Sequence, residues 1–180
     1  RLPHLDVPFV RDQDLQRVFT GHASLWDIFT GVGLRDRHPP LYFAVLHVAQ
    51  LFGQSEAVVR MPAVLSGALM GPALVAAAVL LGRRVALAAV LALVPTVGFA
   101  FVSYSREVSS LPFYALVLVL FATSVAQHHE TGARNWRVAV SVSVAVALFT
   151  YYTAVFPVLA VLLLLTGFGA AYANTRRAVL

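Results

Sequence analysis

The segment 138–175 contains no charged side chain, and this limits the folds open to the chain. As one helix it would measure ~57 Å at ~1.5 Å per residue, nearly twice the ~30 Å hydrocarbon core of a bilayer. It must therefore turn back on itself, and the polar residues Thr150 to Thr153 mark the turn. Pro157 then falls in the first turn of the returning helix, where its missing N–H costs nothing. The segment therefore predicts two helices embedded in a membrane.

The rest of the chain has the same character. Of its 180 residues, 59% are hydrophobic and only 12% are charged, and the mean hydropathy is +0.80, a balance that soluble domains do not have. It contains no cysteine, which excludes disulfides and thiolate metal sites. We therefore predict an all-α, multi-pass transmembrane helical bundle. Its expected spans are about 61–82, 85–102, 108–126, 138–152 and 153–173.

The polar segment 1–37 precedes these spans and predicts an extracytoplasmic loop with short juxtamembrane helices. Ser24 to Asp27 form a capping box, which marks a helix start. Trp26 within it is suited to anchoring this loop at the membrane interface. Region 38–180 is then the transmembrane helical region, and it opens with a short helix at 41–52 that reaches only ~18 Å. That helix is too short to span and is expected to be embedded partway or to pack against a cavity.

The arginines set the orientation of the bundle. Those at 83–84, in the expected polar loop 127–137 and at 176–177 fall on one side, which the positive-inside rule makes cytoplasmic. The segment 1–37, the expected loop 103–107 and the turn at 150–153 fall on the other side. All carboxylates except Glu130 lie on that outer side. We therefore predict a multi-pass protein of the cell membrane whose active face is extracytoplasmic.

The outer face combines groups that could catalyse transfer chemistry. A carboxylate near hydrocarbon has a raised proton affinity and can act as a general base, and arginine presents a fork that suits phosphate oxygens. This combination favours transfer of a group from a lipid-linked phosphate donor, although solvated loop charges and snorkelling arginines account for the same residues. The arginines are scattered at helix ends, which argues against a nucleic-acid partner. The groups concerned are Asp12, Asp14, Asp36, Glu107, His38, Arg35, Arg37, Arg60 and Arg106.

Several short motifs together resemble a known family, and they are collinear over nearly the whole chain. The most specific is the HPPLY block. In this sequence the motifs read DRHPPLYF at 36–43, LFGQSE at 51–56, RMPA at 60–63, LGRR at 81–84, YSRE at 104–107 and FTYY at 149–152. They are similar to motifs of bacterial GT-C glycosyltransferases of the protein mannosyltransferase and aminoarabinose transferase type.

The resemblance implies a multi-pass helical bundle that transfers a sugar, with inversion, from a polyprenyl-phosphate carrier to an acceptor hydroxyl on the outer face. The acceptor would be a glycan, a lipid or a protein, and a divalent cation is a possible cofactor. The implied catalytic residues are Asp12 or Asp14 as the base and Asp36 as a second acid that positions the acceptor or a cation. Arg60 and Arg106 are implied to bind the donor phosphate. The implied substrate-binding residues are His38, Tyr42, Glu107 and Tyr151.

The chain departs from the family pattern at four places. The usual Asp-Glu pair reads Asp12-Gln13-Asp14, the glutamine of the YSQE loop is Arg106, and the histidine of the YTHY turn is Tyr151. Where the family has a further arginine, this chain has Ser109 and Ser110. These departures leave open a non-catalytic alternative, which is a transporter-like bundle or a relative that binds polyprenyl lipid without transfer. We also expect the sequence to be incomplete at both ends, and the piece alone to be inactive.

Overall fold

The computed structural model describes residues 20, 22–32, 39–82, 93, 98–161 and 163, and every regular element among them is helical. The predicted all-α class is confirmed. The labelled elements are α2 (Leu25–Asp27), η1 (Ile28–Val32), α4 (Leu41–Gln50), α5 (Glu56–Leu80), α7 (Phe99–Arg106), α8 (Leu111–Thr131), α9 (Arg134–Thr150) and η2 (Tyr152–Ala154). An apolar helix continues from η2, Tyr152–Val161.

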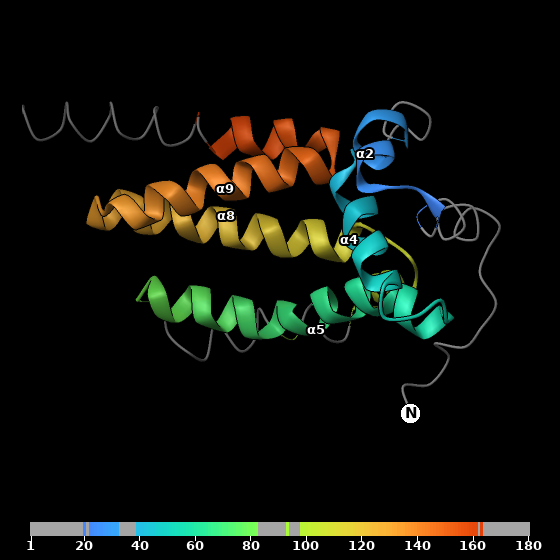
Figure 1. Cartoon of the computed structure of the whole chain (residues 1–180). Coiled ribbons are helices and arrows are strands. Elements are labelled where there is room, and N and C mark those ends of the chain that lie inside the picture. The colour runs from blue at the N-terminus through green and yellow to red at the C-terminus, as the bar shows by residue number, and fades with distance from the viewer. Residues whose placement is uncertain are drawn as a thin grey trace, which may run out of the picture.

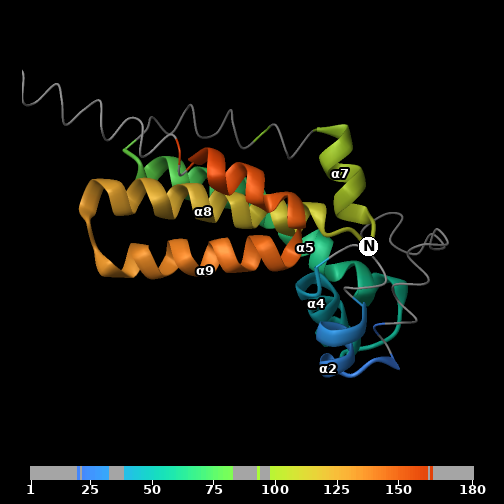
Figure 2. The same ribbon diagram turned by 90° about the horizontal axis from the view of Figure 1, so that it is seen from above.

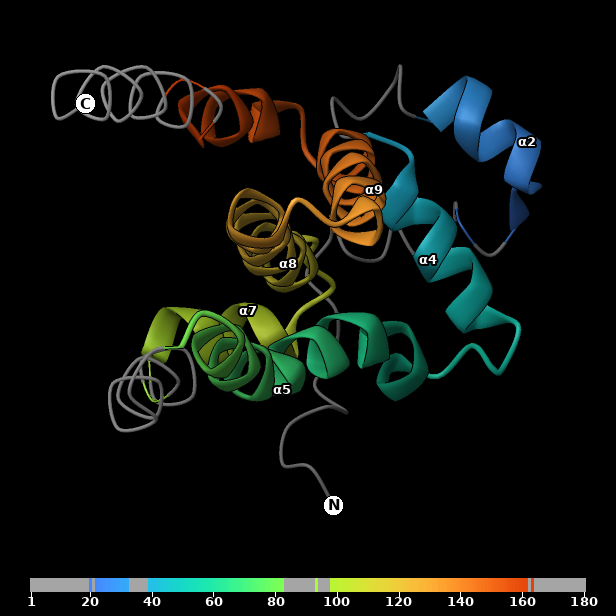
Figure 3. The same ribbon diagram turned by 90° about the vertical axis from the view of Figure 1, so that its left-hand side faces the viewer.

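The long helices form a bundle that is crossed at one end. Helices α5, α8 and α9 run along a common direction, and α4 lies across one end of them, with α2 beyond it (Figures 1 and 3). We call this the α4 end. Figure 2 shows the turn between α8 and α9 at the opposite end, and α7 at the α4 end. The start of α8 and the end of α9 therefore lie close to α4.

Two helices among the described residues, α5 and α8, are long and apolar enough to cross a membrane, with mean hydropathies of 2.1 and 1.5 over their most apolar windows. Their outward faces are apolar as well. Leu65, Leu69 and Leu120 are each more than half exposed. Rows of exposed leucine on long helices are unfavourable in water but suit contact with lipid. The helix Tyr152–Val161 is apolar but shorter than these two, and α9 is also shorter, with 17 residues.

Helix α5 begins earlier than the sequence predicted. Ser55 caps it by accepting a hydrogen bond from the N–H of Val58, so the helix starts at Glu56 rather than near residue 61. Pro62 consequently lies inside the helix, where it cannot donate to the backbone. Figure 3 shows α5 changing direction between its first turns and the remainder, as expected for a helix with an interior proline. The bend brings the first turns of α5 against α4.

The loops expected at 103–107 and 127–137 are mostly helical. Residues 103–106 continue α7, and most of 127–137 is helical, since α8 extends to Thr131 and α9 starts at Arg134. Polar side chains mark where the hydrocarbon ends, but a helix can continue into water for another turn. The turn between α8 and α9 is made instead by Gly132, which has φ 65° and ends α8 in the left-handed conformation.

The predicted turn at 150–153 is present. Helix α9 ends at Thr150, Tyr151 is extended with φ −151°, and η2 begins at Tyr152. Pro157 lies in the first turns of the returning helix, where its missing N–H has no partner to lose. Described residues in the expected span 85–102 are 93 and 98–102, so most of that span lies outside the described residues. In the expected span 153–173, the structure describes residues 153–161 and 163, and the remainder lies outside the described residues.

The short helix α2 confirms the predicted capping box. Asp27 N–H donates to Ser24 Oγ at 3.2 Å, and Ser24 N–H donates to Asp27 Oδ2 at 3.0 Å. The Ser24 hydroxyl also donates to Asp27 Oδ2 at 2.6 Å, and these hydrogen bonds lower the pKa of the Asp27 carboxyl below its ordinary value. Trp26 beside them is 75% exposed. Its role as a membrane anchor stays a prediction.

Candidate functional site

A pocket of about 130 Å³ lies at the α4 end, where three segments far apart in the sequence meet. Its walls come from the first turn of α4, from the residues that lead into α8, and from the end of α9. Each of these segments carries or follows one of the motifs singled out above. The lining residues are Tyr42, Phe43, Val108, Ser109, Ser110, Leu111, Thr150 and Tyr151.

The sequence explains why these three segments end at the same place. Pro40 precedes α4 and fixes the start of that helix, as proline does when its missing N–H is an orphan in any case. Helix α8 starts after Ser110, with Pro112 in its first turn. Helix α9 ends at Thr150, whose hydroxyl donates to the carbonyl of Val146 at 2.6 Å. Two helix starts and one helix end thus surround the pocket.

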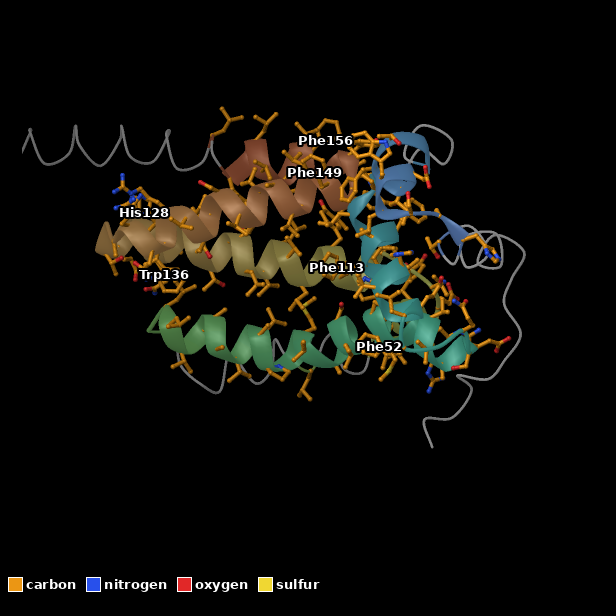
Figure 4. All side chains as sticks on the ribbon, viewed as in Figure 1. Phe52, Phe113, His128, Trp136, Phe149 and Phe156 are labelled. Atoms are coloured by element: carbon orange, nitrogen blue, oxygen red, sulfur yellow. The ribbon has the colours of Figure 1, made fainter. Side chains whose placement is uncertain are left out.

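Apolar packing holds α4 in this position. Leu46 and Phe43 of α4 are buried with Val59 of α5 and Val108 before α8 in one core cluster. Phe113 packs against the cluster, and its ring lies 6.3 Å from the ring of Tyr42, tilted by 43°. Figure 4 shows Phe113 at the end of α8 that meets α4, whereas His128 and Trp136 lie at the opposite end. The pocket is therefore built on packed helices.

Tyr42 carries a buried hydroxyl group at the pocket. Its side chain is 4% exposed, and its hydroxyl lies near the backbone N–H of Ser109. That approach falls short of hydrogen-bond geometry, and the hydroxyl makes no hydrogen bond with any residue that the structure describes. Burial raises the pKa of Tyr42, and the N–H of Ser109 offsets only part of the effect. The hydroxyl therefore keeps its proton and is available as a donor to a ligand.

Tyr151 forms the opposite wall. Its ring stacks on that of Tyr114, with 5.3 Å between the centroids and 23° between the planes. Tyr114 belongs to α8 and also packs against the core cluster of Val117, Ala147 and Ala154. The stack fixes the ring of Tyr151 at the position where the resemblance led us to expect histidine. In place of an imidazole, tyrosine presents a flat aromatic face and a hydroxyl group.

Polar and apolar groups both line the pocket, and none of its lining residues in the described part of the chain is charged. The two candidate phosphate-binding arginines lie elsewhere. Arg60 is buried in α5 with 4% of its surface exposed, and Arg106 is exposed at the end of α7. Glu107 is also exposed and does not line the pocket. Of the five candidate site residues that the structure describes, Tyr42 and Tyr151 line the pocket together, and Arg60, Arg106 and Glu107 do not.

The candidate acids lie outside the described residues, as does His38. This applies to Asp12, Asp14 and Asp36, whose roles stay predictions. Within the described ranges, no group of three His, Asp or Glu side chains could hold a metal ion. The possible divalent cation is therefore a prediction tied to the acids of the segments 1–19 and 33–38.

Sequence reasoning missed most of the lining residues. Ser109 and Ser110 were noticed only as the place where the family arginine is lacking, and Thr150 only as part of a turn. Nothing local marks Val108 or Leu111 as pocket residues, since each is an ordinary apolar side chain. Their role depends on where three helices end relative to one another. Hydrophobic periodicity does not report that relation.

A polar contact ties the N-terminal segment to α4. Thr20 is fully buried, and its carbonyl accepts a hydrogen bond from His47 Nδ1 at 2.8 Å. The amide of Gln50 donates to the Thr20 hydroxyl at 2.9 Å. His47 is thus hydrogen-bonded within the fold. The contact holds the chain a few residues after Asp12 and Asp14 against the helix that starts at the pocket.

We expect the substitution Thr20→Val to loosen this contact. Valine has nearly the same shape, but it removes the acceptor of a buried amide, at a cost of about 1–3 kcal/mol. The expected result is faster proteolytic cleavage in the segment before α4, while the helix bundle stays intact. The matched control is Thr30→Val, because Thr30 is exposed and bonds only locally to the carbonyl of Trp26. Equal cleavage rates for the two variants would show that the contact of Thr20 with α4 does not hold the N-terminal segment in place.

Comparison with known proteins identifies a family. The family model of dolichyl-phosphate-mannose-protein mannosyltransferases matches residues 37–178, well over half of the chain. The matched region contains all the pocket-lining residues and all the long helices described above. No curated protein and no solved structure gave a significant match.

Proposed function

The chain belongs to the dolichyl-phosphate-mannose-protein mannosyltransferase family, a family of membrane glycosyltransferases, and from this premise we propose its reaction. It transfers a sugar from a polyprenyl-phosphate donor to an acceptor hydroxyl, with inversion at the anomeric carbon. The transfer takes place on the extracytoplasmic face of the membrane. The acceptor is a glycan, a lipid or a protein of the cell envelope.

The observation that carries this proposal is the meeting of three motif segments in one pocket. Tyr42 from the HPPLY block, Ser109 from the residues after the YSRE motif and Tyr151 from the FTYY turn all line it. Motifs that act on one substrate must meet around it, and these three do so although they are far apart in the sequence. The pocket lies at an end of helices that are long enough to cross a membrane, where a lipid-linked donor would present its head group.

The polarity of the pocket also fits a sugar phosphate. The start of α8 provides backbone N–H groups without intrahelical partners, and the end of α9 provides carbonyl groups without them. The two helix ends therefore carry opposite partial charges of roughly half an elementary charge. A phosphate matches the first, and the hydroxyls of a sugar can donate to the second. Together they would orient a glycosyl phosphate across the pocket.

The test is a transfer assay with the full-length protein, of which this sequence is expected to be a piece, in proteoliposomes. A panel of radiolabelled polyprenyl-phosphate sugars is offered together with membrane lipid, cell-wall glycan and protein acceptors. We expect label from one donor to enter one acceptor class, and we expect the new glycosidic bond to have the anomeric configuration opposite to the donor. Empty liposomes and free nucleotide sugars are the controls. Transfer from a nucleotide sugar alone would contradict the proposed donor.

One observation favours a second candidate function. Among the residues that the structure describes, no charged side chain lines the pocket, and Arg60 and Arg106 lie outside it. A relative that binds polyprenyl phosphate without transferring sugar would need no catalytic base near the ligand. In the same assay, this candidate predicts saturable binding of polyprenyl phosphate with no label in any acceptor.

A further inference from the structure

We propose that this pocket binds a phosphate group through the N-terminus of α8 and the hydroxyl of Tyr42, two donors that carry no formal charge. The inference rests on the proposed function and deepens it, since it names the part of the pocket that receives the phosphate of the ligand. It also replaces Arg60 and Arg106 as the expected phosphate-binding residues. The chemistry recognised is a phosphate monoester or diester at the membrane surface.

The first observation is the way α8 begins. This helix has 21 residues and its start lines the pocket through Ser110 and Leu111. Ser110 has helical dihedral angles, φ −75° and ψ −15°, and its side chain makes no capping hydrogen bond. The N–H of Leu111 makes a long hydrogen bond of 3.3 Å to Ser109 Oγ. The positive end of the helix dipole is therefore not neutralised by a capping carboxylate, and it faces the pocket.

The second observation is independent of the helix. The Tyr42 hydroxyl comes from α4, is buried, and has no hydrogen-bond partner among the residues that the structure describes. A buried hydroxyl without a partner is unfavourable and rare in native proteins, and a bound ligand that accepts from it would remove this cost. Because burial keeps this hydroxyl protonated, it can donate to a phosphate oxygen. It lies beside Ser109 N–H, so two donors converge on the same side of the pocket.

The surrounding charges are compatible with an anion there. Within the described ranges no carboxylate lines the pocket, and Glu107, which directly precedes the lining residue Val108, is exposed. The end of α9 has the opposite polarity, so the phosphate belongs on the α8 side and away from Thr150. Hydrogen bonds from neutral donors to a charged oxygen are about twice as strong as those between neutral groups. A few such donors in a partly dry pocket can hold a phosphate.

The test measures binding rather than transfer. The full chain in lipid nanodiscs is titrated with polyprenyl monophosphate, with the neutral polyprenol, with phosphatidate and with inorganic phosphate. We expect polyprenyl monophosphate to bind at least about tenfold more tightly than polyprenol, because one hydrogen bond to a charged group is worth about 1.5–3 kcal/mol. Competition by phosphatidate would assign the same subsite to a phospholipid head group, and competition by inorganic phosphate to the free anion.

Two substitutions separate the subsite from general damage. Tyr42→Phe removes one hydroxyl, and we expect it to weaken monophosphate binding about tenfold while polyprenol binding stays unchanged. The control Tyr104→Phe removes an exposed hydroxyl of α7 outside the pocket and should leave both affinities unchanged. Ser110→Asp is compared with Ser110→Asn. Both residues are good helix caps, but only aspartate repels an anion, so the Asp variant should bind monophosphate about tenfold more weakly than the Asn variant.

The outcomes distinguish this inference from the proposed function. If Tyr42→Phe and Ser110→Asp bind monophosphate as tightly as wild type and Ser110→Asn do, the subsite is refuted. Sugar transfer by wild type would then leave the proposed function standing with its phosphate held elsewhere. If the variants lose monophosphate affinity as expected but wild type transfers no sugar, the subsite is supported and the proposed function fails.

Discussion

Replacing Asp12 by asparagine is expected to lower the rate of sugar transfer by ~10²-fold or more while leaving donor binding nearly unchanged. Asparagine has the shape of aspartate but cannot accept a proton from the acceptor hydroxyl, and a positioned general base contributes ~10²–10⁴-fold to such reactions. The loss should therefore appear in kcat, with little change in the KM for the donor. The measurement is the transfer assay on the full chain, with donor binding followed separately.

The neighbouring acids are compared in the same assay. Asp14→Asn and Asp36→Asn test the alternative base and the second acid, and we expect one of the three variants to lose far more activity than the other two. Asp27→Asn is the matched control, because Asp27 is an exposed carboxylate whose hydrogen bonds all go to Ser24 of its own capping box. Comparable losses in Asp27→Asn and Asp12→Asn would show that charge in this segment matters, rather than a base.

The largest expected effect on stability is that of Phe121→Ala. Phe121 is 1% exposed and lies in a core cluster with Val125 of α8 and Val158 of the helix after η2. Removing a buried phenylalanine costs about 3–5 kcal/mol in soluble cores, through lost transfer energy and a cavity. Between helices in lipid the transfer part is small, because lipid is as apolar as the core. We therefore expect about 2 kcal/mol, mainly from lost packing.

The measurement is reversible unfolding in mixed micelles. Leu120→Ala is the matched control, since Leu120 precedes Phe121 on α8 but is 51% exposed. It should lower the free energy of unfolding by much less, because its side chain contacts lipid or detergent in both states. If Leu120→Ala destabilises the protein as much as Phe121→Ala, the packing of α8 described here is wrong.

The class of the fold could be predicted from the sequence because it depends on local, additive properties. Long uncharged runs require helices in a membrane, since each helix satisfies its own backbone hydrogen bonds there. The capping box at Ser24 and the turn after Thr150 were predictable for a similar reason, because each is decided by a few adjacent residues. The polar stretches were less informative. They were interpreted as loops at 103–107 and 127–137, although α7, α8 and α9 extend through most of both.

The motifs identified the family but not the pocket. The HPPLY resemblance agrees with the family match over residues 37–178, and it pointed to Tyr42 and Tyr151. It also pointed to Arg60 and Arg106, which the structure places outside the pocket. A motif records which residue stands at a position, whereas a pocket depends on which atoms face one another after packing.

By itself, the sequence determined that this chain is an all-α membrane protein of a glycosyltransferase family, because hydropathy and motif order are written along the chain. Only the tertiary structure decided that α4 crosses the end of the bundle and that Tyr42, Ser110 and Tyr151 meet around one pocket. That arrangement follows from the packing of buried residues that are far apart in the sequence, such as Leu46, Val59 and Val108. Contacts between residues so far apart have no local signal in the sequence. They place the start of α8 beside the Tyr42 hydroxyl, which has no hydrogen-bond partner among the described residues.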